Sequence, residues 1–196
     1  MNFKDSKTCK NLMRAFAGES QARNRYTFAA NVARKNNLYV VEAVFNYTAG
    51  QEKEHAEVFY NLLNECAGET IFIDGGYPVD ISNDVKELLK MAKHNEYEEY
   101  DDAYPSFAAT AKEEGFENIA NIFLNIAKIE KTHGDRFGRL AEALENGTMF
   151  MSDCETKWMC LNCGHIQNSK GVPEVCPVCK HNKGYFIRME FSPYEN

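Results

Sequence analysis

Apolar residues recur every three or four positions along the chain up to about Asn146, which is the spacing of one face of an α-helix. The first such stripe runs from Leu12 to Ala33 and is closed by a turn at residues 35–37. The second runs from Val41 to the neighbourhood of Cys66. These stripes predict two amphipathic helices joined by a short turn.

Two further helices follow after a long connection rich in Gly and Asp. The third is expected to start after a cap at Ser82 or Asn83 and to be bent or interrupted at Pro105. The fourth runs from Ile119 to Leu144 with apolar steps of four and three. Four helices with one long crossover predict an all-α, ferritin-like four-helix bundle.

Acidic and histidine residues occupy the middle of each stripe, where an apolar residue is expected. Side chains three positions apart share one helix face, so a Glu-x-x-His pair can hold a common centre. Several carboxylates in a dry core repel one another, and an unpaired buried charge costs several kcal/mol. Two cations would balance them, and oxygen and imidazole ligands suit iron or manganese. The in-stripe residues are Glu19, Glu52, His55, Glu96, Glu99, Glu130 and His133.

Two tyrosines lie on the same faces as these acids. Tyr26 follows Glu19 by two helical turns, and Tyr104 comes shortly after Glu99, next to Pro105. A buried tyrosine needs a partner for its hydroxyl group, and a carboxylate ligand offers one. The sequence is compatible both with tyrosines that donate hydrogen bonds to the metal ligands and with tyrosines that only pack in the core.

The composition changes after Gly147, which divides the chain into residues 1–146 and 147–196, with a linker expected at about 147–157. The tail contains two Cys-x-x-Cys motifs separated by twelve residues. Four thiolates in this spacing can surround one zinc or one iron, and the spacing does not distinguish the metals. The expected ligands are Cys160, Cys163, Cys176 and Cys179, beside a small aromatic core of Trp158, Tyr185, Phe186 and Phe191.

Charge and cysteine usage narrow the class of protein. The net charge is −7 over 196 residues, and no stretch concentrates Lys and Arg, so we expect no nucleic-acid or membrane partner. Seven cysteines, four of them in a metal-like array, favour a reducing compartment, and no apolar leader precedes the first helix. We therefore expect a cytoplasmic protein in which Cys9, Cys66 and Cys154 are ordinary thiols.

The order of these motifs resembles the rubrerythrin family over essentially the whole chain: Glu19, E-K-E-H at 52–55, E-Y-E-E at 96–99, E-K-T-H at 130–133, then the cysteine pairs. The resemblance implies a ferritin-like di-iron bundle with a C-terminal rubredoxin-like domain. It also implies a non-haem peroxidase that reduces hydrogen peroxide to water in oxidative-stress defence. An NAD(P)H-dependent reductase or a rubredoxin would supply electrons through the four-cysteine iron site of a homodimer or larger assembly.

The resemblance also implies a role for each ligand. Glu52 and Glu130 correspond to bridging carboxylates, Glu19 and Glu96 to terminal ligands, and His133 to a constant ligand of one iron. The irons are oxo- or hydroxo-bridged when oxidised. The other iron exchanges Glu99, bound when oxidised, for His55, bound when reduced. The candidate catalytic residues are Glu99, His55, Tyr26 and Tyr104.

Two other functions remain open at this point. A ferroxidase or iron-storage protein would use the same bundle, although the tail would obstruct a closed shell. A zinc-binding module on a helical scaffold would use the same four cysteines, because zinc and iron take the same thiolate ligands. One departure bears on the tail: Lys180 follows Cys179, whereas Gly164 follows Cys163 as in rubredoxins.

Overall fold

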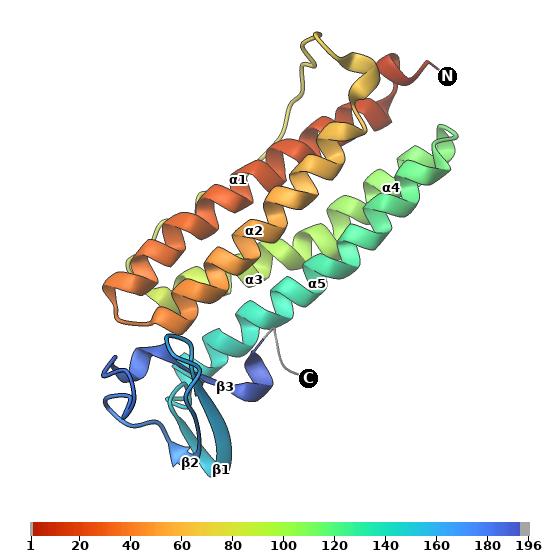
Figure 1. The fold of residues 1–196 in the computed structure, drawn as a ribbon. Helices are drawn as coiled ribbons and strands as arrows, with labels where there is room; N and C mark the ends of the chain where they lie inside the picture. The colour runs from red at the N-terminus through yellow and green to blue at the C-terminus, as the bar shows by residue number, and fades with distance from the viewer. Residues whose placement is uncertain (1, 193–196) are drawn as a thin grey trace.

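The first two helices form an antiparallel hairpin in the computed structural model, which describes residues 2–192. They are α1 (Lys7–Lys35) and α2 (Tyr39–Asn61), with a short 3-10 turn at Asn64–Cys66. Residues 67–84, which we call the strap, then run back along α1 to the start of the third helix (Figure 1). The predicted turn at residues 35–37 and the long crossover are therefore both present.

The second layer of the bundle is built from α3 (Val85–Glu98), α4 (Tyr104–Glu113) and α5 (Glu117–Glu145). Figure 1 shows α4 continuing along the line of α3, so that the two act as one interrupted helix beside α5. The predicted ferritin-like four-helix bundle is confirmed. Within residues 2–192, no helix has both the length and the apolar character needed to cross a bilayer.

The start of α3 differs from the prediction in its capping residue. Asp84 is the N-cap, and its carboxylate accepts a hydrogen bond from the Lys86 backbone N–H at 2.8 Å. Ser82 instead accepts from the Asp84 N–H at 3.0 Å, so caps at Ser82 or Asn83 were wrong. A carboxylate at this position also interacts favourably with the helix dipole.

The interruption expected at Pro105 takes the form of a π turn at Glu99–Ala103, between α3 and α4. Proline has no backbone N–H, so the carbonyl four residues earlier loses its helical partner. The wider turn accommodates this loss without breaking the helix. It also shifts the face on which the residues of α4 lie relative to those of α3.

Two apolar clusters fill the bundle on either side of its acidic middle. Phe45 and Phe137 contact each other in the cluster near the tail, with ring centroids 5.1 Å apart. Phe59 and Phe123, also 5.1 Å apart, do the same in the other cluster. All four are fully buried. The charged residues between them are therefore closed off from water along the bundle axis.

The tail forms a small three-stranded sheet at one end of the bundle (Figure 1). Its strands β1 (Met151–Cys160), β2 (Ile166–Gly171) and β3 (Phe186–Arg188) are antiparallel in the order β2-β1-β3. Residues 151–157, expected within a linker, are thus part of β1, and Cys154 is an exposed residue of that strand.

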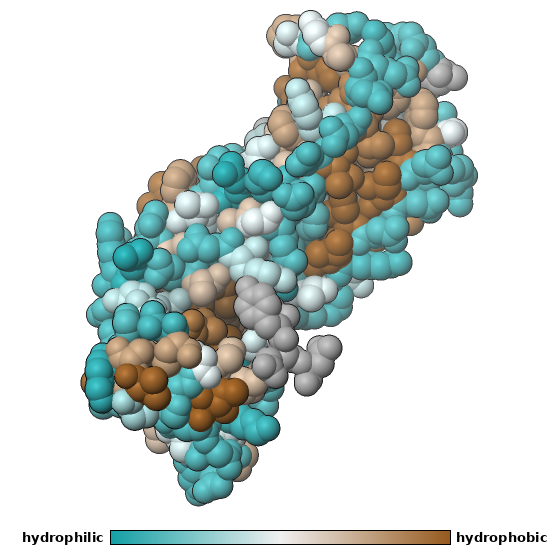
Figure 2. Space-filling view, in the orientation of Figure 1, coloured by the Kyte–Doolittle hydropathy of each residue, from teal (hydrophilic) through white to brown (hydrophobic). Residues whose placement is uncertain are grey.

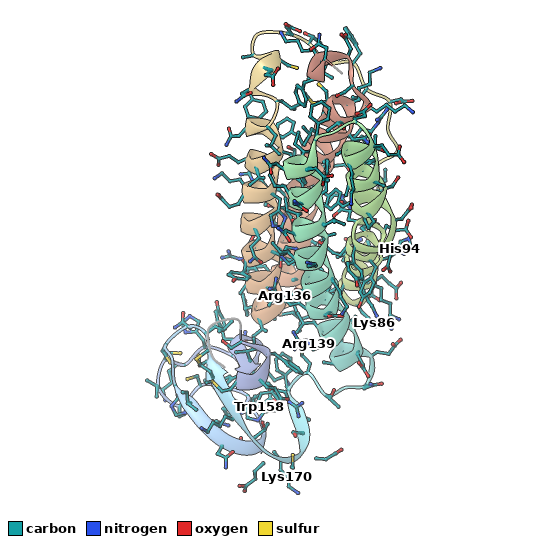
Figure 3. The ribbon with its side chains drawn as sticks, turned by 90° about the vertical axis from the view of Figure 1, so that its right-hand side faces the viewer. Lys86, His94, Arg136, Arg139, Trp158 and Lys170 are labelled. Atoms are coloured by element: carbon teal, nitrogen blue, oxygen red, sulfur yellow. The ribbon has the colours of Figure 1, made fainter. Side chains whose placement is uncertain are left out.

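The aromatic residues of the tail divide between two environments. Trp158 and Phe186 are fully buried in the tail, as expected. Tyr185 packs beside them and also stacks on Tyr39 of α2, with ring centroids 4.1 Å apart. Phe191 packs against the bundle core, so its assignment to the core of the tail was wrong. Figure 3 shows Trp158 in the tail below Arg139 of α5.

We expect Gly184→Ala to weaken the docking of the tail onto the bundle. A Cβ at position 184 would lie 1.9 Å from the backbone oxygen of Asn37, which cannot move aside cheaply. Such overpacking costs about 1–3 kcal/mol. Thermal unfolding should begin at lower temperature, and proteolysis between Gly147 and Phe150 should become faster. Gly50→Ala, whose Cβ meets nothing within 4 Å, is the control, and equal behaviour of the two variants would contradict this account.

Candidate metal centre

Six buried side chains in the middle of the bundle form two overlapping groups of ligand atoms. One group contains Glu19 and His55, the other Glu96 and His133, and Glu52 and Glu130 belong to both. Within each group the ligand atoms lie within 4.8 Å of one another. Two groups that share two carboxylates are the arrangement expected for a pair of adjacent cations with those carboxylates between them.

The helices position these side chains through the three-residue spacing of the two Glu-x-x-His pairs. The Nδ1 atom of His55 lies 2.9 Å from a Glu130 oxygen and 3.2 Å from a Glu52 oxygen. The Nδ1 atom of His133 lies 2.9 Å from an oxygen of each of the same two glutamates. The two imidazole rings are nearly parallel, with centroids 5.7 Å apart. Each histidine therefore faces the shared carboxylates from its own side.

The arrangement of nitrogen and oxygen atoms in this cluster is better suited to binding metal ions than to forming hydrogen bonds. Within residues 2–192, both nitrogens of His133 and both oxygens of Glu130 are buried without a hydrogen-bond partner, although two of them are 2.9 Å apart. Two ligands about 2.1 Å from one cation and at right angles to each other lie roughly 3 Å apart. The lone pairs thus converge on common points, and nitrogen and oxygen donors are those that iron uses in such bundles.

Burial and mutual repulsion perturb the acids of the cluster. Burial, followed by the charges of neighbouring glutamates, raises the pKa of Glu19 and Glu96 well above the ordinary value. Burial alone would also raise the pKa of Glu52, but the two histidines hold it down to about 2. Without cations, the carboxylates can coexist only with protons among them.

The histidines show the opposite effect of the same surroundings. Burial would lower the pKa of His133, yet Glu130, Glu52 and Glu96 raise it to about 12. Burial likewise opposes the charged form of His55, and Glu130 and Glu52 raise its pKa to about 9. Both imidazoles are therefore cationic at neutral pH when no metal occupies the cluster, which is the charge that metal ions would replace.

Both tyrosines singled out in the sequence donate hydrogen bonds to the cluster. Tyr26, on α1, donates to Glu96, and Tyr104, at the start of α4, donates to Glu19. Burial raises the pKa of each phenol well above its usual range, so both remain protonated donors. Each tyrosine thereby fixes a carboxylate that belongs to only one of the two groups.

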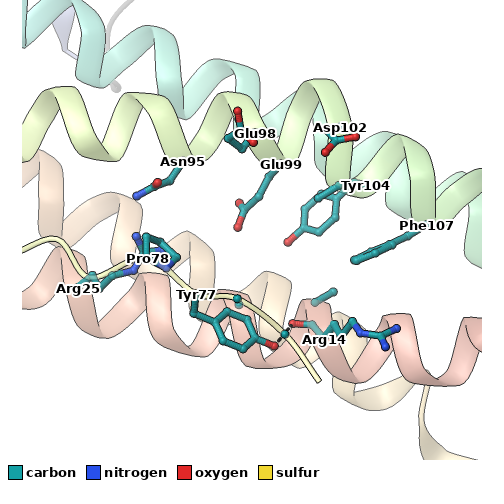
Figure 4. A pocket seen from close by; sticks show the side chains of 15 residues that line it. Arg14, Arg25, Tyr77, Pro78, Asn95, Glu98, Glu99, Asp102, Tyr104 and Phe107 are labelled. Atoms are coloured by element: carbon teal, nitrogen blue, oxygen red, sulfur yellow. Dashed lines mark hydrogen bonds between the residues drawn. The ribbon is translucent and has the colours of Figure 1, made fainter. Parts of the chain in front are cut away.

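Glu99 lies outside both groups, although its place in the sequence stripe put it beside Glu96. It is the first residue of the π turn, and its carboxylate points into a cavity of about 370 Å³. Figure 4 shows it between Asn95 and Tyr104, facing α1 and the strap. Burial, and then the charge of Glu96, raises the pKa of Glu99 well above the ordinary value. The cavity and the metal cluster share Tyr104 as part of their common wall.

The residues that close this cavity were not found in the sequence. Arg25 of α1 pairs with Asp80 of the strap at 2.6 Å, and Asn95 donates to the same carboxylate at 2.7 Å. Arg14 holds the strap through Asp74, also at 2.6 Å. The Arg25–Asp80 and Arg14–Asp74 pairs join residues that are 55 and 60 positions apart in the sequence. The apolar stripes of single helices do not predict contacts of this kind.

Arg136 is another residue near the site that the sequence pattern did not single out. It follows His133 by one turn of α5, and it donates to Thr48 at 2.9 Å and to Gln51 at 3.1 Å. Figure 3 labels it in the half of the bundle nearer the tail. Its guanidinium also lies 5.1 Å from the centroid of the Tyr47 ring. It places a half-buried positive charge next to the acidic cluster.

The four cysteines of the tail converge as their spacing predicts. The Cys160 and Cys179 sulfurs are 3.7 Å apart, and the Cys163 and Cys176 sulfurs 3.8 Å. Four sulfurs about 2.3 Å from a central ion in a tetrahedron lie roughly 3.8 Å apart, so the site has the size of a metal–thiolate centre.

The two knuckles of the tail are nearly equivalent despite the lysine in one of them. Gly164 has φ 75° and Lys180 has φ 64°, and each donates its N–H to the first cysteine of its own knuckle. A left-handed conformation is uncommon for a residue with a side chain. Lys180 nevertheless adopts it, so the replacement of glycine leaves the geometry of the site unchanged.

Comparison with known proteins gives one consistent result. The family model Rubrerythrin matches residues 10–141, and the model for the rubrerythrin rubredoxin-like domain matches residues 158–187. The chain is 45% identical to the rubrerythrin of Porphyromonas gingivalis, with 96% of this chain and 93% of the relative covered. It is 40% identical to the rubrerythrin of Nitratidesulfovibrio vulgaris, with 94% and 95% covered. Nigerythrin in its mixed-valence state is a similar solved structure, with TM-score 0.62, 27% identity and 94% and 90% covered.

Proposed function

The chain belongs to the rubrerythrin family, with a di-iron site in the bundle and a rubredoxin-like four-cysteine site in the tail, and we propose that it is a peroxidase that reduces hydrogen peroxide to water. The observation that carries the proposal is the pair of ligand groups sharing Glu52 and Glu130, with a cavity beside them at Glu99. A metal-storage role gives no reason for a cavity with an ionisable side chain directed into it.

The proposed reaction is H₂O₂ + 2e⁻ + 2H⁺ → 2H₂O. When bound, a pair of irons can supply both electrons, one from each metal, which is what cleavage of the O–O bond requires. Glu99 supplies a proton, because its raised pKa favours the protonated form and its carboxyl group faces the cavity. Tyr26 and Tyr104 hold Glu96 and Glu19 in place, and the apolar clusters on both sides keep bulk water out.

We further propose that Glu99 and His55 alternate at one of the two metal positions, as the family resemblance implies. The arrangement seen here has His55 with Glu19, Glu52 and Glu130, and Glu99 turned into the cavity. With irons bound, this placement of the two side chains would suit the reduced state of that exchange, since a neutral imidazole suits ferrous iron and an anionic oxygen suits ferric iron. The π turn at Glu99–Ala103 gives this segment a backbone that can be rearranged without breaking a regular helix.

Electrons are proposed to arrive through an iron held by the four cysteines, from an NAD(P)H-dependent reductase or a rubredoxin in the cytoplasm. Figure 1 places the tail at the end of the bundle, away from its middle, so a second copy of the chain is proposed to bring the two sites together. Figure 2 shows hydrophobic residues along a groove between α2 and α5, in the half of the bundle away from the tail. Exposed apolar residues on these helices include Val58 and Leu124, which supports a homodimer or larger assembly.

Single-turnover measurements test the proposed function. Iron-loaded protein, reduced chemically without oxygen, is expected to consume one hydrogen peroxide per iron pair and yield water. Glu99→Gln should slow this step by about 10²–10⁴-fold, because glutamine can neither donate the proton nor bind as an anion. Glu113→Gln, an exposed position on α4, is the control. A ferrous spectrum of the native protein that peroxide leaves unchanged would contradict the proposal.

A further inference from the structure

The cavity beside Glu99 is larger than hydrogen peroxide needs. Its volume of about 370 Å³ lies within the range of roughly 300–1,000 Å³ that small-molecule sites occupy. A water molecule takes about 30 Å³ in the liquid, and hydrogen peroxide has only one more heavy atom than water. The size of the cavity therefore leaves room for a substrate that carries a carbon group.

The lining of the cavity has a polar and an apolar side, with Glu99 between them. Figure 4 shows Arg25 and Asn95 on one side of Glu99, and Tyr104 and Phe107 on the other, with Arg14 and Asp102 at the rim of that second side. Ala15, Pro78 and the ring of Tyr77 add further apolar surface. Hydrogen peroxide is polar at both ends and gains nothing from such a wall, whereas a molecule with one polar and one apolar end matches it.

The polar side of the cavity is set by an ion pair. Arg25 lines the cavity and pairs with Asp80 at 2.6 Å, and Asn95 donates to the same carboxylate at 2.7 Å. These groups give the end of the cavity beside Glu99 a fixed polar surface.

From the size and the two-sided lining, we propose that the cavity binds organic hydroperoxides, ROOH, with the carbon group against Phe107 and Tyr77 and the hydroperoxide group at Glu99. The reaction is ROOH + 2e⁻ + 2H⁺ → ROH + H₂O, in which the O–O bond is cleaved and reduced. Both protons come from the solvent, one of them by way of the Glu99 carboxyl group, which is reprotonated afterwards. The inference rests on the proposed peroxidase function, which supplies the two electrons.

Gly18 offers a way to fill the cavity from α1. A Cβ at this position would lie 3.8 Å from a Tyr77 ring carbon and 3.9 Å from a Glu99 oxygen, which is ordinary contact. Gly18→Ala is therefore tolerated, and the longer side chain of Gly18→Leu takes up space that the carbon group of the substrate needs. Gly50→Leu is the matched control, because position 50 is exposed on α2 and a Cβ there meets nothing within 4 Å.

Binding is measured first, without turnover. The probe is cumyl alcohol, the product expected from cumene hydroperoxide, titrated by calorimetry into iron-loaded, oxidised protein with no reductant. Saturable binding is expected in the native chain and in Gly50→Leu. In Gly18→Leu the Kd should rise at least about tenfold, since one misplaced methylene in a pocket costs roughly 10–200-fold. Absence of saturable binding to the native chain overturns the proposal, whether or not the leucine variant folds.

Turnover then separates this proposal from the one it rests on. The ratio of cumene hydroperoxide to hydrogen peroxide reduction should fall at least about tenfold in Gly18→Leu and stay the same in Gly50→Leu. Reduction of hydrogen peroxide but not of cumene hydroperoxide by the native chain overturns the inference alone. Binding of the alcohol without reduction of either peroxide overturns the peroxidase function and leaves the binding site standing.

Discussion

Replacing Glu130 by alanine is expected to remove both metals from the bundle and to abolish peroxide reduction. Glu130 is fully buried, belongs to both ligand groups and lies 2.9 Å from the Nδ1 atom of each histidine. Loss of the shared carboxylate removes a ligand from each metal and leaves the remaining acids without their cations. Activity should fall by more than about 10³-fold, beyond the roughly 10–100-fold typical of residues that only support ligands.

The measurements are iron content per chain and single-turnover rate. The tail provides an internal control, because its four cysteines should load their metal normally if the variant is folded. Glu19 belongs to only one ligand group, so the variant Glu19→Ala should lose one metal rather than two. Glu142→Ala, exposed on the same helix as Glu130, should behave as native protein. Retention of two irons in the bundle of Glu130→Ala would show that this carboxylate is not shared.

The helical part of the site could be predicted because its cause is local. Glu52 with His55, and Glu130 with His133, follow from the three-residue step of a regular helix, and each apolar stripe fixes which face is buried. The flanking phenylalanines set the same phase on each helix. Once that phase is known, inward charges on four helices must meet in the middle of the bundle.

Glu99 marks the limit of that reasoning. Its backbone is still helical and its N–H bonds back to Asn95 and Glu96, so its place in the stripe holds. Periodicity fixes the face on which a residue lies but not its side-chain rotamer. The carboxylate of Glu99 is directed into the cavity, while the charge of Glu96 still acts on it.

Contacts between distant segments were also beyond the sequence pattern. The pairing of Arg25 with Asp80 depends on the path of the strap across α1, and the contact of Phe191 with the bundle depends on how the tail docks. Neither position belongs to a periodic stripe. The cavity that we assign to organic hydroperoxides is built from such contacts, which is why it became visible only in the structure.

Removal of the metals is expected to make the stability of the chain fall steeply as pH rises. In the metal-free protein the pKa of His55 is about 9 and that of His133 about 12, against an ordinary value of 6.5. A raised pKa means that the folded state binds the proton more tightly, so the stabilisation is complete below pH 6.5 and is lost as pH rises through the folded pKa. From about pH 6.5 to 9 each imidazole contributes a loss on the order of 3 kcal/mol.

The acids of the cluster either also destabilise the metal-free protein as pH rises or titrate outside the range from about pH 6.5 to 9. The raised pKa values of Glu19 and Glu96 penalise folding above their ordinary value of 4.5, again as pH rises. The lowered pKa of Glu52, about 2, gives stability that is present above 4.5 and lost only as pH falls toward 2. Between about pH 6.5 and 9 the metal-free chain should therefore become less stable with every step.

Iron-loaded protein should lack this dependence, because metals occupy the ring nitrogens and carboxylate oxygens that protons otherwise hold. The difference between the free energies of unfolding of the two forms should widen from about pH 6.5 to 9 in urea titrations. In the metal-free chain, His55→Gln should flatten the slope, and His94→Gln, an exposed position on α3 (Figure 3), should leave it as it is. If the free energy of unfolding depended on pH equally in the metal-free and iron-loaded protein, protons and metals would not compete for these ligands. That result would contradict the assignment of the charged cluster as the metal site.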